Sequence, residues 1–192
     1  MPRPKGPALT RDAVITAAIH SLEADGVEGF GINRVARTLG IKPPSLYNHV
    51  SSNDDLREAV VLAGWSRLAQ DFDAAARSGA PAVRTLTQMA DAYRAFAQSH
   101  PALYALMSST TLDPQQPAAG DVASRIIESL ATVLPPIRSE GLHAIRALRA
   151  AMHGFVMLEL AGQLGDPQSA DLSYRWMIDG LTRIALPQET QA

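Results

Sequence analysis

Apolar residues recur every three to four positions through most of the chain, which is the spacing of amphipathic α-helices, and no segment alternates long enough to form a strand. A first helix is predicted between Thr10, a good N-cap, and Gly26, which ends it. A second is predicted over about residues 32 to 39. A third begins at Pro43, because proline suits the first turn of a helix.

A long helix follows these three short ones, over about residues 53 to 76. Ser52 and Asp55 have the spacing of a capping box at its start. Proline, glutamine and threonine mark a loop over residues 109 to 121. Further helices are predicted after Pro81, after Pro101, up to Leu134, and over about residues 139 to 163 and 170 to 186. The pattern therefore predicts an all-α fold of about nine helices.

Charge is distributed unevenly along the chain. The net charge of −2 argues against a simple nucleic-acid binder. Residues 1 to 50, however, carry six basic and four acidic residues, whereas residues 51 to 192 carry eleven and fifteen. A basic end on an acidic body fits a protein that meets phosphate at one end only. We expect an N-terminal domain at residues 1 to 52, with a disordered basic arm over residues 1 to 9, and a C-terminal domain at residues 53 to 192.

The second and third short helices, joined by a turn at Gly40, match the plan of a helix-turn-helix DNA reader. On the third helix, Leu46 and Val50 are predicted to point inward. The outward positions hold small or polar residues, namely Pro44, Ser45 and Asn48. Such side chains allow close approach to the major groove, and Ser and Asn can bond base edges. An ordinary three-helix bundle is the alternative.

Side chains able to bond phosphate oxygens flank this third helix: Lys42, Tyr47 and His49, with Arg34 on the preceding helix. Phosphate contacts of this kind fix the register of a reader without reading sequence. Three of the four also have a structural alternative. Tyr47 suits the edge of a core, His49 suits a helix C-terminus, and Arg34 suits a solvated surface.

Residues 30 to 56, FGINRVARTLGIKPPSLYNHVSSNDDL, resemble the DNA-binding segment of the tetracycline-repressor (TetR) family of regulators. The matching features are Val35-Ala36, Leu39-Gly40-Ile41, Pro43, Leu46-Tyr47, His49 and the Ser-x-x-Asp-Leu start of the long helix. The resemblance implies a homodimer built on the last two helices, which represses transcription by blocking a palindromic operator. It also implies a pocket in the C-terminal domain for a small-molecule effector that weakens operator binding.

Three positions depart from the family pattern. Gly31 and Lys42 stand before the second and third helices, where the family usually has a capping Ser or Thr. Asn53 stands where a phosphate-binding Lys is common. A lost cap weakens a helix by about 1 kcal/mol or less, and Lys42 supplies a phosphate-binding group in exchange. We include Asn53 among the predicted DNA contacts.

The C-terminal domain has more inward-facing aromatic and methionine residues than dimerisation alone requires. The predicted ligand-lining set is Trp65, Phe72, Met89, Tyr93, Phe96, Tyr104, Met107, Met152 and His153, and plain core is the alternative for each. An uncharged or weakly polar effector is expected. Residues 151 to 162, AMHGFVMLELAG, are similar to the His-Gly segment of a WHG-type C-terminal domain found in some family members, although the usual Trp is Arg149 here.

The helix near residues 147 to 162 is apolar almost all round, which predicts burial on two sides. One side would meet its own domain and the other a second subunit, with a buried monomer core as the alternative. The predicted dimer contacts combine small and large residues of the last two helices: Ala151, Gly154, Leu158, Ala161, Trp176, Gly180 and Leu181.

Other functional classes find little support in the sequence. The chain has no cysteine, no histidine pairing typical of a metal site and no nucleotide-binding or nucleophile motif, so we expect no enzyme, metal or cofactor. No signal peptide or membrane span is evident, which predicts a cytoplasmic protein with no membrane partner. A helical adaptor that binds only protein is the remaining alternative, disfavoured by the small polar outward face of the third helix.

Overall fold

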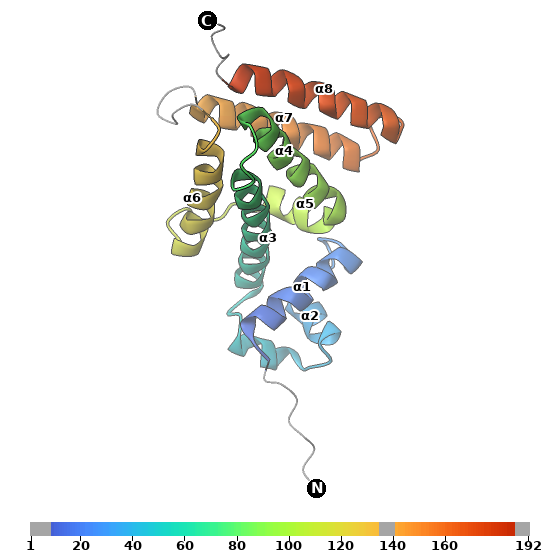
Figure 1. Cartoon of the computed structure of the whole chain (residues 1–192). Helices are drawn as coiled ribbons and strands as arrows, with labels where there is room; N and C mark the ends of the chain where they lie inside the picture. The colour runs from blue at the N-terminus through green and yellow to red at the C-terminus, as the bar shows by residue number, and fades with distance from the viewer. Residues whose placement is uncertain (1–8, 135–140, 187–192) are drawn as a thin grey trace, which may run out of the picture. The chain divides into compact units, whose positions relative to one another are not determined.

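The computed structural model describes residues 9 to 134 and 141 to 186. Within these ranges it contains nine helical elements and no strand, which confirms the predicted all-α fold. The elements are α1 (Arg11–Asp25), α2 (Ile32–Thr38), the 3₁₀ helix η1 (Pro43–Asn48), α3 (Asn53–Ala76), α4 (Ala82–Ser99), α5 (Pro101–Ser109), α6 (Pro117–Ala131), α7 (Leu142–Leu160) and α8 (Pro167–Ala185) (Figure 1). The predicted basic arm, apart from Leu9, lies outside the described residues, as does the predicted start of a helix near residue 139.

Two elements differ in detail from the sequence-based expectation. The third short helix is 3₁₀ in form, with Ser45 N–H donating to the Lys42 carbonyl at 2.9 Å and His49 N–H to the Leu46 carbonyl at 2.8 Å. The element has only six residues, and short helical segments of this length often take the 3₁₀ form. Helix α6 begins at Pro117, inside the predicted loop, because a proline at this position fits a first turn.

The chain divides into two compact units. The first unit comprises Met1–Trp65 and His100–Asp113, and the second comprises Ser66–Ser99 and Pro114–Ala192. Helix α5 therefore belongs to the first unit although it follows α4 in the sequence. The domain boundary expected at residue 52 stays a prediction.

The core of the first unit forms where the short helices turn their apolar faces inward. Its fully buried side chains include Val14 and Leu22 of α1, Val35 of α2, and Leu46 of η1. Thr10 Oγ1 caps α1 by accepting a hydrogen bond from Ala13 N–H at 3.1 Å. Because η1 has only six residues, it has little stability of its own. It therefore depends on this packing to hold its outer face in place.

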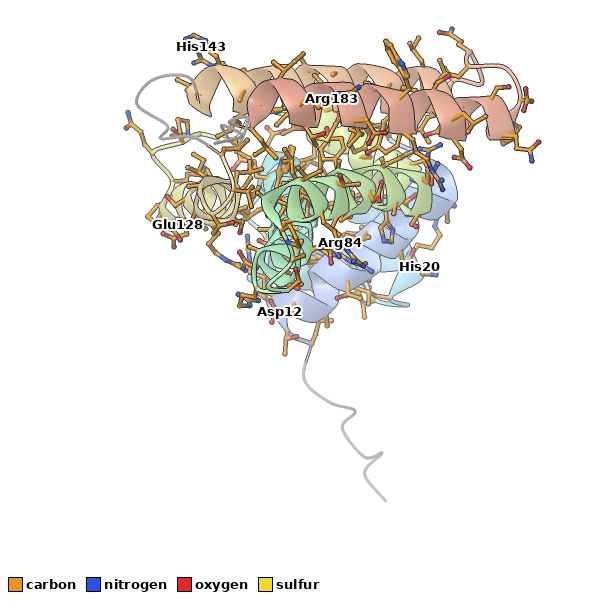
Figure 2. The ribbon with its side chains drawn as sticks, turned by 45° about the horizontal axis from the view of Figure 1, so that its top comes forward. Asp12, His20, Arg84, Glu128, His143 and Arg183 are labelled. Carbon is orange, nitrogen blue, oxygen red and sulfur yellow. The ribbon has the colours of Figure 1, made fainter. Side chains whose placement is uncertain are left out.

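The second unit is built from α4, α7 and α8, each of which packs against the other two, together with α6 and the end of α3. Its core includes Met89 and Ala97 of α4, Val156 of α7, and Tyr174 and Ile178 of α8. Helices α7 and α8 run side by side in both views; His143 marks α7 and Arg183 marks α8 in Figure 2. None of the described helices is both long and apolar enough to cross a membrane.

Candidate functional site

The turn between α2 and η1 sets the orientation of the predicted reading helix. Gly40 adopts a φ of 66°, a left-handed conformation that glycine takes without strain. Ile41 N–H donates back to the Ala36 carbonyl at 3.0 Å and so closes the end of α2. Lys42 follows, exposed, at the N-terminus of η1, where its side chain makes no capping bond. The residue therefore stands next in the chain to the exposed residues of η1.

The two faces of η1 separate as the sequence predicts. Leu46 is fully buried and Val50 is 2% exposed. The three residues predicted to face outward are all exposed: Pro44, Ser45 and Asn48. Tyr47 leaves 56% of its surface exposed, which disfavours the core-edge alternative for this residue. The result is a small polar surface on a helix whose opposite side is locked in the core.

A cluster around Asp55 fixes the joint between η1 and α3. Asp55 Oδ2 accepts hydrogen bonds from Ser51 N–H at 2.6 Å and from the Ser51 hydroxyl at 3.0 Å, while Asp55 N–H donates to Ser52 Oγ at 3.0 Å. The Ser52 half of the predicted capping box is therefore present, and the return bond goes to Ser51. Arg11 donates to Asp55 Oδ1 at 2.7 Å and also to the His49 carbonyl.

Arg11 thus joins the start of α1 to both ends of this joint. The hydrogen bond from Arg11 is the main reason why the pKa of Asp55 is lowered from the ordinary 3.8 to about 2. Burial of the carboxyl group acts in the opposite direction and raises this pKa. The half-buried His49 is the C-cap of η1, and its backbone accepts from Arg11. Sequence reasoning missed this arrangement, because Arg11 and Asp55 are 44 residues apart.

Asn53 and Gly31, two of the departures from the family pattern, compensate for each other. Asn53 Oδ1 accepts a hydrogen bond from Ile32 N–H at 2.9 Å, so the side chain caps α2 from across the first unit. Gly31 itself offers no capping side chain. A Cβ at Gly31 would lie 3.2 Å from Asn53 Oδ1, tighter than ordinary van der Waals contact. The absent side chain at position 31 therefore makes room for the cap, and a phosphate contact by Asn53 would have to use its amide nitrogen.

Arg34 forms a two-pronged ion pair with Asp25 at the end of α1. Its Nε donates to Asp25 Oδ2 at 2.5 Å, and its Nη2 donates to Oδ1. This hydrogen bonding is the largest cause of a lowered pKa for Asp25 and of a raised pKa for Arg34. The guanidinium therefore has a structural role, and its predicted phosphate contact stays a prediction.

The predicted ligand-lining residues divide between the two units. Trp65, Tyr104 and Met107 belong to the first, and the other six belong to the second: Phe72, Met89, Tyr93, Phe96, Met152 and His153. Trp65 and His153 are half-buried, and the rest are buried. Their roles in ligand binding remain predictions.

Arg94 is the centre of a polar cluster in the second unit that the sequence did not reveal. It donates from Nε to Glu159 Oε2 at 2.9 Å and pairs through Nη2 with Asp171 Oδ1 at 2.7 Å. Its guanidinium also lies 4.6 Å from the ring centre of Tyr174, whose hydroxyl donates to the Ala90 carbonyl at 2.5 Å. The pKa of Arg94 is raised, mainly because its guanidinium donates hydrogen bonds to Glu159. The pKa of Tyr174 is also raised, mainly because its hydroxyl is buried. Arg94 thereby ties α4 to both α7 and α8.

Helices α7 and α8 carry an exposed apolar face. Leu172, Trp176 and Ile184 of α8 are 68%, 78% and 84% exposed, and Leu158 of α7 is 44% exposed. The smaller predicted dimer contacts lie on the same two helices or just beyond α7: Ala151, Gly154 and Ala161 on one, Gly180 and Leu181 on the other. A Cβ added at Gly154 or Gly180 would meet nothing within 4 Å. Exposed apolar side chains and small residues therefore occur together on these two helices, and the predicted dimer contacts stay predictions.

Comparisons with known proteins agree with this geometry. Residues 86 to 181 match the family model described as "Tetracyclin repressor-like, C-terminal domain". An uncharacterized HTH-type transcriptional regulator of Mycobacterium tuberculosis, Rv0681, is 36% identical over 170 residues, covering 82% of this chain and 73% of the relative. The class D tetracycline repressor of Escherichia coli is 37% identical over 54 residues, covering 28% of this chain and 25% of that protein.

Solved structures share the fold. A protein of unknown function from Rhodococcus sp. RHA1 superimposes with a TM-score of 0.78 at 21% identity, over 97% of this chain and 100% of that one. A TetR variant from Acinetobacter baumannii AYE, in complex with minocycline, gives a TM-score of 0.68 at 23% identity, over 92% and 96%. At these identities the likeness concerns the fold alone.

Proposed function

Because the chain belongs to the TetR family of transcriptional regulators, and so is not an enzyme, we propose that it represses transcription by binding a palindromic operator as a homodimer. A small-molecule effector would release it from the operator. The single observation that carries the proposal is the outer face of η1, where small polar side chains are held outward by the buried Leu46.

The DNA contacts follow from the positions of the side chains on that face. Ser45 and Asn48 would bond base edges in the major groove, with Pro44 allowing close approach. Lys42, Tyr47 and His49 would bond phosphates at the two ends of η1. Asn53, through its amide nitrogen, and Arg34 are weaker candidates, because each already bonds another part of the first unit.

The exposed face of α7 and α8 supports the proposed homodimer. Water contact with Leu172, Trp176 and Ile184 is unfavourable, and a second copy of the same face would remove it around a two-fold axis. Two reading helices would then meet half-sites about 34 to 36 Å apart on one side of the duplex. The aromatic and methionine residues of the second unit would line the effector pocket, which favours an uncharged or weakly polar molecule.

Two substitutions test the assignment of contacts, using a duplex enriched by selection and fluorescence anisotropy over a range of salt concentrations. Lys42→Ala should weaken binding to all sequences alike and lower the salt slope by about 1, because it removes one phosphate contact. Asn48→Ala should cost about 1 to 3 kcal/mol on the selected duplex and relax the preference at one position. Arg67→Ala is the matched control, since it removes one exposed positive charge from α3 in the second unit. Equal effects of Lys42→Ala and Arg67→Ala would contradict the assignment.

A further inference from the structure

Lysine is rare in this chain and occurs only in its N-terminal part. Of the 17 lysine and arginine residues, Lys5 and Lys42 are the two lysines, and the others are arginines. Lys5 lies outside the described residues, so Lys42 is the one lysine that the structure describes. A lysine amine can lose a proton and act as a nucleophile, whereas the guanidinium of arginine stays protonated in proteins. Among the described residues, chemistry that acylates side-chain amines would therefore act at Lys42 alone.

Lys42 is placed where a modifying reagent or enzyme can reach it. It lies in the turn between α2 and η1, and its backbone is extended, with φ of −81° and ψ of 142°. The residue is exposed, and its side chain makes no capping hydrogen bond to η1. None of the ion pairs found among the described residues involves it. An acyl group on Lys42 would therefore disturb neither a helix cap nor an ion pair of the described structure.

We propose that Lys42 is a site of acylation that weakens DNA binding, with an acyl thioester or an acyl phosphate as the donor. The lone pair of the neutral Nζ attacks the acyl carbon, and a C–N bond forms. The C–S bond of the thioester, or the C–O bond to the phosphate, breaks and leaves its electron pair on the departing thiolate or phosphate. The proton released from nitrogen passes to water. The product is an amide without charge, which has lost the ammonium group of the lysine.

The effect of this modification rests on the proposed function, in which Lys42 bonds a DNA phosphate. An uncharged amide no longer neutralises that phosphate. Each phosphate contact contributes about 0.9 to the slope of log affinity against log salt concentration. Loss of one contact should therefore weaken duplex binding about fivefold per modified subunit at about 0.15 M salt. Because Lys42 stands where a capping Ser or Thr is usual and does not cap, its charge can be removed without loss of a cap.

The test treats the full-length protein with acetyl phosphate in one arm and acetyl coenzyme A in the other, with and without the enriched duplex. Mass spectrometry of peptides measures acetylation at Lys42, and fluorescence anisotropy measures the affinity for the duplex. Without DNA, at least one donor should acetylate Lys42, and the modified protein should bind about fivefold more weakly per modified subunit. Bound duplex should slow the acetylation of Lys42, because the amine then contacts a phosphate. The arm that labels Lys42 identifies the class of donor.

Two substitutions separate Lys42 from the other amines of the protein. Lys42→Arg keeps a positive charge but removes the amine, so its affinity for the duplex should not respond to either donor. Lys5→Arg is the matched control, because it removes the other lysine and should respond to the donor as the unsubstituted protein does. An equal loss of affinity in treated Lys42→Arg would place the effect at another amine and overturn the proposal.

The remaining outcomes distinguish a failure at Lys42 from a failure of the proposed function. If the untreated protein binds duplex and acetylation of Lys42 leaves that affinity unchanged, the proposal for Lys42 fails alone. It also fails alone if neither donor acetylates Lys42. If the untreated protein binds no duplex, the proposed function fails, and the effect proposed for Lys42 fails with it.

Discussion

Replacing Asn53 by Ala should destabilise the first unit by removing the cap of α2. The Asn53 side chain is the acceptor for Ile32 N–H at 2.9 Å, and Gly31 cannot replace it. Loss of an N-terminal cap costs about 0.5 to 2 kcal/mol, typically about 1 kcal/mol. We therefore expect Asn53→Ala to lower the free energy of unfolding by about 1 kcal/mol.

The structure also predicts how this substitution depends on position 31. Gly31→Ser offers α2 a cap from its own N-terminus, and the extended backbone there, with φ of 167°, accepts any residue. In the presence of Asn53 the new Cβ meets Asn53 Oδ1 at 3.2 Å, so the gain should be close to zero. With Asn53→Ala the crowding disappears and Gly31→Ser should restore about 1 kcal/mol.

Urea unfolding of the four proteins, followed by circular dichroism, measures this coupling. We expect an interaction free energy of about 1 kcal/mol between positions 31 and 53. Equal effects of Gly31→Ser in both backgrounds would refute the capping argument. The affinity for the duplex distinguishes a capping role of Asn53 from a phosphate contact. If Asn53 acts mainly as a cap, Asn53→Ala should lower this affinity less than Lys42→Ala does.

Two further predictions concern the dimer and the response to acid. Trp176→Asp should raise the dissociation constant of the homodimer at least about tenfold, because it places a charge in the apolar face of α7 and α8. Sedimentation equilibrium measures this constant. An unchanged dissociation constant would place the interface elsewhere. Since the pKa of Asp55 is lowered from 3.8 to about 2, the stability that its ion pair with Arg11 contributes is present above about pH 4 and is lost as the pH falls toward 2. Asp55→Asn should flatten the pH dependence of unfolding in that window, and an unchanged slope would show that the pair contributes nothing.

Local patterns were sufficient to predict the helix-turn-helix segment. The spacing of Leu46 and Val50 assigned the inner face of η1, and Gly40 marked the turn before it. These signals are local because each depends on neighbours within one or two helical turns. The pattern also placed the start of η1 at Pro43, although it did not indicate the 3₁₀ form of that helix.

The supporting contacts were not predictable in the same way. Asn53 caps a helix 21 residues away, Arg11 pairs with an aspartate 44 residues away, and Glu23 caps a helix about 80 residues away. Nothing in the spacing of such residues indicates a partner, because only the tertiary fold brings them together. The position of Asn53 in the sequence suggests a phosphate contact, whereas its side-chain oxygen accepts a hydrogen bond from Ile32 N–H. Arg34 is a similar case, held by Asp25.

The most direct test of the account is selection of binding sites from a random pool of duplex DNA by the purified protein, at stated salt concentrations and after refolding to remove any bound ligand. The account predicts an enriched palindrome whose half-sites lie about one helical turn apart, about 34 to 36 Å, bound by one homodimer. Failure to enrich any sequence at any salt concentration would contradict the claim that the outer face of η1 reads DNA.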